Sequence, residues 1–163
     1  MKEILLQLAT YNHWAHKRIC ETILTLDEPL HQQIVNSSFP NLYSTVLHLW
    51  DAESVWWQRM KLHEKMVVPS ETFNPTMKEA VNGLLSQAAL WVEFVEASSE
   101  LRLTHVFEYR NSHKELFKQP LSEVLIHVFN HGTYHRAQLV TMMHELGQTK
   151  IPPTDFIVWS RKK

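Results

Sequence analysis

The chain has 163 residues and a mass of 19.2 kDa, which is enough for one domain (residues 1–163) with a substantial apolar core. Sixteen Lys and Arg residues against 17 Asp and Glu residues give a formal net charge of -1, which argues against binding to nucleic acid or to a membrane surface. The single cysteine, Cys20, excludes an internal disulfide and a cysteine-rich zinc site, whereas 11 histidines offer nitrogen donors. No long apolar run follows the N-terminus, so we expect a cytoplasmic protein without a membrane span.

The first half of the chain has the pattern of two long helices. Apolar residues recur at helical spacing from Ile4 onward and predict a helix over residues 2–26, which ends before Pro29 because proline cannot continue the backbone hydrogen bonds. A second segment with the same periodicity opens after Pro40 and predicts a helix over residues 41–64.

A third helix, a hairpin and a fourth helix follow. Residues 74–79 combine a capping residue, a proline and a Thr-x-x-Glu capping box, and predict a helix over residues 76–99. Residues 103–109 alternate and are rich in strand-forming side chains, residues 110–113 offer a turn, and residues 115–117 complete a short hairpin.

The last predicted helix carries the residues that say most about function. It starts at Pro120 and stops at Gly147, and the tail at residues 151–159 is apolar enough that we expect it to pack back onto the bundle. Within the helix, His131 and His135 are one turn apart and belong to an apolar stripe, so both are expected to face the interior. The stripe comprises Leu121, Val124, Val128, His131, His135, Leu139, Met142 and Leu146.

The histidine pair predicts half of a metal site. Imidazoles at i and i+4 can converge on one ion, but two ligands hold a divalent ion weakly, so a third donor is needed from another helix. His48 is the best candidate, because it borders the apolar face of the second helix, and His48, His131 and His135 would leave an ion at least one open position. Alternatively, each histidine is an interior residue with an ordinary hydrogen-bond partner. Gly132 indicates a close approach to the backbone, by a ligand or by a neighbouring helix.

The residues that carry this prediction match a known family. Residues 130–138 (Asn-His-Gly-Thr-Tyr-His-Arg-Ala-Gln) resemble the helix-four signature of the DinB-like proteins, and residues 46–53 (Val-Leu-His-Leu-Trp-Asp-Ala-Glu) resemble their helix-two motif. Residues 11–15, the predicted hairpin and the tail around Asp155 also fit, so the resemblance spans nearly the whole chain. It implies an all-α four-helix bundle of up-down-down-up topology, often a homodimer, with a divalent metal held by histidines that fall here on His48, His131 and His135.

Three positions depart from the family pattern. Tyr134 stands where a further histidine is frequent, Ala137 where glycine is common, and His16 where asparagine is common. The three ligand positions are intact. The departures therefore bear on the substrate pocket and not on the metal site.

Five further residues lie close to the predicted ligands in sequence. His127, one turn before His131, is either an orienting partner or a ligand in place of His48. Asp51 and Glu53 follow His48; either could orient a ligand or act as a general base, and a solvated helix face is an equal alternative. Arg136 and Gln138 could contact an anionic substrate, although a structural role between helices is favoured.

Other candidates have simpler interpretations. His13 and His16 are three apart on the first helix and are expected at its surface or boundary. Cys20 has no activating neighbour in sequence and is expected to be a buried, inert thiol. Four tryptophans at helical spacing predict core or a dimer face and not a substrate cage. They are Trp50, Trp56, Trp57 and Trp91.

The leading function is that of a metal-dependent enzyme acting on a small molecule. An open position on zinc, nickel, iron or copper can acidify a bound water or a small-molecule thiol. The family that the chain resembles, together with its relatives, includes transferases and isomerases that use low-molecular-weight thiols. The resemblance therefore favours S-transfer to an electrophile, whereas a hydrolase would use water instead. A stress-associated protein that binds metal or ligand without catalysis is the alternative from another class. A nucleic-acid repair factor is disfavoured by the charge balance.

Overall fold

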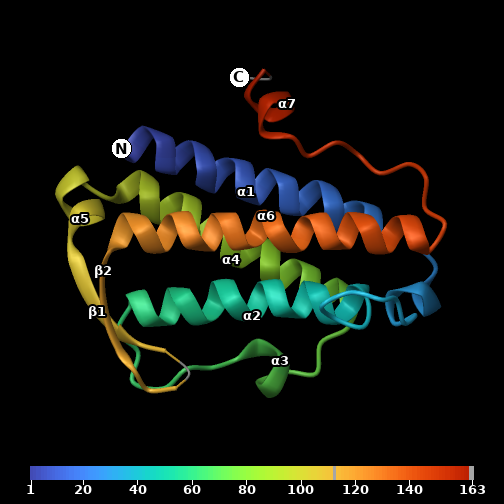
Figure 1. Cartoon of the computed structure of the whole chain (residues 1–163), viewed down its shortest axis with the longest axis horizontal. Helices are drawn as coiled ribbons and strands as arrows, with labels where there is room; N and C mark the ends of the chain where they lie inside the picture. The colour runs from blue at the N-terminus through green and yellow to red at the C-terminus, as the bar shows by residue number, and fades with distance from the viewer. Residues whose placement is uncertain (112, 162–163) are drawn as a thin grey trace.

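A computed structural model describes residues 1–111 and 113–161, and it is a bundle of four long helices (Figure 1). The first and last helices run in one direction and the middle two in the other, which confirms the predicted all-α, up-down-down-up bundle. The predicted turn includes Ser112, which lies outside the described residues. The four helices are α1 (Lys2–Ile23), α2 (Leu42–Met60), α4 (Met77–Ala97) and α6 (Leu121–Glu145).

Local side-chain chemistry starts two of these helices where the sequence predicts. Asn41 accepts a hydrogen bond from the Ser44 backbone N–H (2.8 Å) and caps α2. The predicted capping box of α4 is complete, because Thr76 accepts from the Glu79 backbone and Glu79 accepts from the Thr76 backbone. These caps satisfy backbone N–H groups that have no partner within the helix.

Short elements connect the long ones. The predicted hairpin is present as β1 (Val106–Arg110) and β2 (Leu116–Pro120), an antiparallel pair in which Tyr109 faces Phe117. Four short helices complete the described chain: η1 (Glu28–His31), α3 (Pro69–Thr72), α5 (Glu100–Thr104) and α7 (Phe156–Ser160).

The C-terminal tail packs back onto the bundle, as predicted. Trp159 of α7 is buried against Tyr11 of α1, with ring centroids 6.0 Å apart. The Tyr11 hydroxyl donates to the Thr154 carbonyl (2.7 Å), so the tail is held by both apolar and polar contacts.

Each long helix packs on two others. α1 and α2 lie diagonally across the bundle, and both contact α4 and α6. The apolar interior forms two large clusters, one toward each end of the bundle, with polar residues between them. A small third cluster of Tyr11, Ala15 and Trp159 joins α1 to α7. No helix in residues 1–111 or 113–161 is long and apolar enough to span a bilayer.

The predicted stripe of the first helix is wrong at its start. Ile4 is 64% exposed, whereas Leu5 is buried at 1%. The buried face of α1 follows Leu5 through Asn12 and His16 to Ile19, so it includes two polar side chains. Their presence hides the true stripe, because periodicity analysis assigns polar residues to the outer face.

Candidate metal centre

The three predicted histidines lie together on the seam between α2 and α6. One potential ligand nitrogen from each of His48, His131 and His135 lies within 4.8 Å of the other two. The Nε2 atoms of His48 and His131 are 3.2 Å apart. Two nitrogens bound tetrahedrally at about 2.0–2.1 Å would be roughly 3.3 Å apart, so the spacing suits a single ion.

The electrostatic environment keeps these imidazoles neutral. Burial, together with the neighbouring His135 and His48, lowers the pKa of His131 to about 3. The pKa of His48 is also lowered, by burial first and by His135, against an opposing effect of Asp51. Burial likewise lowers the pKa of His135. Because only a neutral imidazole offers a lone pair, the cluster is ready for metal coordination near pH 7.

Gln138 sets the orientation of one ligand. His135 Nδ1 lies 2.7 Å from Gln138 Oε1, which can only accept, so Nδ1 carries the proton and Nε2 is left for an ion. Gln138 Nε2 in turn donates to Ser38 Oγ (2.8 Å) in the loop before α2. Gln138 thus holds His135 in place and connects α6 to the loop before α2, and it does not bridge two helices as predicted. Arg136 does take the predicted role, because it hydrogen-bonds to Asn12 of α1.

Gln138→Leu should weaken metal binding by about 10–100-fold, the usual cost of losing an orienting partner of a ligating histidine. Competition against a chelator of known affinity measures the change. Gln138→Glu keeps an acceptor for His135 Nδ1 and should recover most of the affinity. Equal affinity in wild type and the leucine variant would show that this hydrogen bond has no role in the site.

Aromatic side chains cover the cluster. Phe39 stacks on His48 with ring centroids 4.3 Å apart and meets His135 edge-on at 5.6 Å. Tyr134, at the position where the family often has histidine, is exposed and packs edge-on against His135. The periodicity of the sequence did not single out Phe39, because it lies in the loop between η1 and α2.

The other acidic and histidine candidates do not join the triad. His127 packs edge-on against Trp56 and its ring centroid is 6.0 Å from that of His131. Asp51 accepts the Ser70 backbone N–H (2.9 Å) at the start of α3. Glu53 faces the bundle interior and hydrogen-bonds to α1. It therefore neither lies on a solvated helix face nor orients one of the three clustered histidines.

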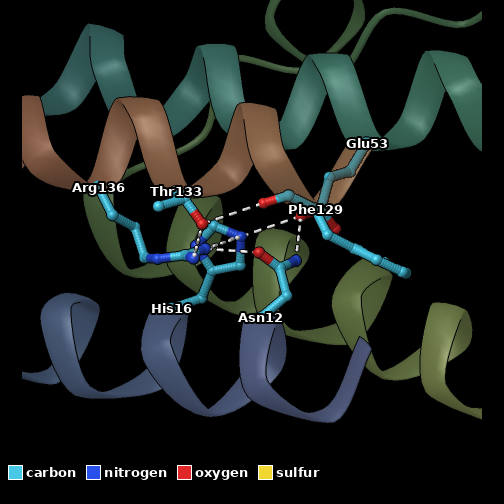
Figure 2. A network of polar contacts seen from close by, with 6 residues as sticks. All are labelled: Asn12, His16, Glu53, Phe129, Thr133 and Arg136. Atoms are coloured by element: carbon cyan, nitrogen blue, oxygen red, sulfur yellow. Dashed lines mark hydrogen bonds and ion pairs between the residues drawn. The ribbon is translucent and has the colours of Figure 1, made fainter. Parts of the chain in front are cut away.

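Glu53 belongs to a polar layer between the two apolar clusters (Figure 2). Asn12 Nδ2 donates to Glu53 Oε1 (2.8 Å), and Arg136 Nη1 donates to Asn12 Oδ1, so Asn12 bridges the two charges. Arg136 Nη2 also donates to Thr133 Oγ1 (2.9 Å) on its own helix. The side chains come from α1, α2 and α6, and the layer therefore fixes the diagonal helices relative to the helix that carries two ligands.

His16 is part of this layer, so its predicted surface position is wrong. It is 0% exposed, and its Nε2 lies 2.9 Å from Glu53 Oε1. Burial lowers the pKa of His16, and the positive charge of Arg136 lowers it further against the opposing effect of Glu53. Neutral His16 therefore donates Nε2–H to the carboxylate. His13 is half-buried at the boundary, as predicted.

Gly132 is required by the polar layer and not by a ligand. A Cβ at this position would lie 2.9 Å from Arg136 Nη1 and 3.3 Å from His16 Nε2, and closer still to Asn12 Oδ1. The close approach predicted from the glycine is therefore made by side chains of α1 and α6. The network needs the space that the missing side chain leaves.

Gly132→Ala should lower the free energy of unfolding by about 2 kcal/mol, although alanine in an exposed helix would add about 1 kcal/mol. The added methyl displaces buried hydrogen-bonding groups that cannot reach water. Urea unfolding followed by circular dichroism measures the change. A more stable variant would contradict the tight packing around the layer.

The remaining candidates are structural. Cys20 is buried and free, and burial raises the pKa of its thiol to about 12, which confirms an inert residue. Trp91 is fully buried and Trp57 packs edge-on against it at 5.0 Å. Trp50 stacks on Phe73 in the segment that follows α3. Trp91 thus belongs to the core, and Trp50, Trp56 and Trp57 pack against the apolar clusters, in agreement with the predicted core role.

The fold and the histidine cluster define the class of protein, a helical bundle with a potential three-histidine metal site between two helices. A model of the DinB family matches residues 1–161, and the chain belongs to this family. It is 24% identical over 163 residues to Protein DinB of Bacillus subtilis (strain 168), which covers 96% of this chain and 93% of that protein.

Solved structures show the same fold. A DinB-like protein from Bacillus cereus ATCC 10987 superposes with a TM-score of 0.70 at 19% identity, over 93% of this chain and 95% of that one. A DinB-like protein from Bacillus subtilis has a TM-score of 0.68 at 13% identity, over 91% of this chain and 98% of that one. At these identities the structural likeness supports the fold alone, and the chemistry has to be argued from the residues of the site.

Proposed function

We propose that the protein is a metal-dependent transferase that activates a low-molecular-weight thiol, with zinc, nickel or iron held by His48, His131 and His135. The observation that carries the proposal is the convergence of three neutral imidazoles within 4.8 Å. Three ligands leave a divalent ion an open position. When bound there, the ion supplies Lewis acidity that favours the thiolate form of a small thiol.

The surroundings of the cluster favour a thiol over water. No hydrogen bond in residues 1–111 and 113–161 joins a carboxylate to one of the three histidines, and Asp51 already accepts from Ser70. A thiol ionises at a pKa of about 8.5 and bulk water at about 15.7, so a thiol needs far less help from a general base. Phe39 offers an apolar surface against which the carbon skeleton of a substrate can lie.

The reaction would form one S–C bond to an electrophile, whose leaving group departs with the electron pair, while the thiol proton passes to solvent. The test mixes metal-reconstituted protein with cysteine, glutathione or coenzyme A and with 1-chloro-2,4-dinitrobenzene. Enzyme-dependent thioether formation, lost in His48→Ala and kept in His127→Ala, is the expected result. Turnover of p-nitrophenyl acetate without thiol transfer would instead favour the hydrolase.

A non-catalytic, stress-associated metal- or ligand-binding protein is the alternative. The absence of a hydrogen-bonded carboxylate beside the cluster in the described residues favours it, because many metal enzymes place a base there. Stoichiometric metal binding without turnover in either assay would support this alternative and contradict the transferase.

We further propose a cytoplasmic homodimer that acts on small molecules and not on nucleic acid. The charge balance supports the exclusion of nucleic acid, and the family resemblance supports the dimer. Sedimentation velocity at two protein concentrations tests the dimer. Unaltered mobility of duplex DNA at low salt is expected, and a shifted band would contradict the small-molecule assignment.

A further inference from the structure

We propose that a cleft between the end of α2 and the β1–β2 hairpin binds a small organic anion with an apolar body. The cleft has a volume of about 750 Å³ and is enclosed by the last turn of α2, the segment after it, and the hairpin. None of the three clustered histidines lines it. It is therefore a second site, beyond the function proposed above.

The wall of the cleft is largely apolar. Six of its lining residues carry apolar or aromatic side chains, and a pocket of this size suits a ligand of a few rings. They are Val55, Leu62, Met66, Val68, Tyr109 and Leu116. Leu62 and Leu116 are 72% and 48% exposed, so the apolar surface faces solvent and an apolar ligand would cover it.

The charge of the lining favours an anion. Arg59, Arg110 and Lys114 face the cleft, and of the two acidic lining residues Glu108 is already paired with Lys118 on the neighbouring strand (3.0 Å). The other acid, Glu64, has no ion pair with any residue that the structure describes. The three cations therefore outnumber the remaining acid, and a bound carboxylate, sulfonate or phosphate group would offset part of this positive charge.

Arg59 is the natural anchor. Its guanidinium lies 4.8 Å from the centroid of the Trp56 ring, and in residues 1–111 and 113–161 it has no hydrogen bond or ion pair. Burial lowers the pKa of Arg59 against an opposing effect of Tyr109, because part of the guanidinium is removed from water. Stacking on Trp56 holds the planar donor group, whose fork matches a carboxylate or a sulfonate.

The cleft lies on the same side of the bundle as the histidine cluster. Arg59 is eleven residues after His48 on α2, which is about 16 Å along one face of a helix. A row of neighbouring rings connects Arg59 to the histidine cluster. The ring centroids of Trp56 and His127 are 5.3 Å apart, and those of His127 and His131 are 6.0 Å apart. An anchored anion would serve as the substrate of the triad only if the proposed function holds, whereas its binding does not depend on the metal.

Fluorescence titration of metal-depleted protein tests the site with two matched probes. The anion 8-anilinonaphthalene-1-sulfonate should bind to the wild-type protein, and Arg59→Met should weaken its affinity at least tenfold. The affinity for the uncharged N-phenyl-1-naphthylamine should change less than twofold in the same variant. Arg102→Met is the control, because Arg102 also stacks on an aromatic ring, that of Phe94, but lies outside the cleft. It should leave both affinities unchanged.

Amide chemical shifts locate the bound probe independently of any variant. Shifts confined to the hairpin, the end of α2 and the segment at residues 61–68 are expected, and shifts elsewhere would overturn the proposal. Unchanged affinity in Arg59→Met, or equal weakening in Arg102→Met, would also overturn it. Release of the probe when the protein self-associates at higher concentration would show that a second copy of the chain occupies the cleft, and this result would also overturn the proposal. Because the assay contains no metal and no turnover, its failure leaves the proposed thiol chemistry untouched.

Discussion

Arg136→Met should lower the free energy of unfolding by about 3–5 kcal/mol, the cost of leaving one member of a buried charge pair without the other. Arg136 is 2% exposed and Glu53 is 1% exposed, and Asn12 joins them by two hydrogen bonds. Methionine fills much of the same volume, so the loss reports the charge and its hydrogen bonds and not a cavity. Urea unfolding followed by circular dichroism measures it.

A double-mutant cycle separates the charge pair from general disruption. Glu53→Gln removes the anion and keeps an acceptor for Asn12 Nδ2. The double variant with Arg136→Met should cost less than the sum of the single changes, because neither charge is then left alone in the interior. Arg102→Met, at an exposed position, should change stability by less than about 0.5 kcal/mol. Strict additivity in the cycle would contradict the pairing across the bundle.

Saturating zinc should stabilise the wild-type protein by about 4 kcal/mol at a free concentration a thousandfold above the dissociation constant. The gain follows because the three imidazoles are brought together only in the folded chain. His48→Ala and His131→Ala should each lose most of this stabilisation, since two remaining imidazoles bind weakly. Thermal unfolding with and without zinc gives the difference for each variant.

His127→Ala is the matched control for this prediction. It removes an imidazole from the same face of α6, one turn from His131, but outside the cluster. The zinc-dependent gain in this variant should equal that of wild type. Loss of the gain in His127→Ala, or its survival in His131→Ala, would mean that the ligands have been misassigned.

The parts of the site that follow from local rules were predictable from the sequence. His131 and His135 share a helix face because they are four residues apart, and His48 is confirmed as their neighbour on α2. The capping box of α4 and the hairpin are likewise local patterns. The histidine pair and the capping box depend on residues within one turn of each other, and the hairpin on two strands that are close in sequence. His48 lies 83 residues before His131, and it was predicted from the apolar face of its own helix and from the family resemblance.

The polar layer could not be predicted in this way. Asn12 and Glu53 come from diagonal helices, and their hydrogen bond depends on how far each helix is rotated in the bundle. His16 looked like a boundary residue because polar side chains normally face outward, and here the buried network overrides that preference. One signal was available: Gly132 implied a close approach, but its partners could be identified only once α1 was placed.

Metal content tests the central claim most directly. Protein purified without an affinity tag, and again after reconstitution, is analysed by elemental mass spectrometry alongside His131→Ala and His127→Ala. We predict about one equivalent of a divalent metal in wild type and in His127→Ala, and almost none in His131→Ala. No bound metal in reconstituted wild type, or equal metal in all three proteins, would contradict the three-histidine site.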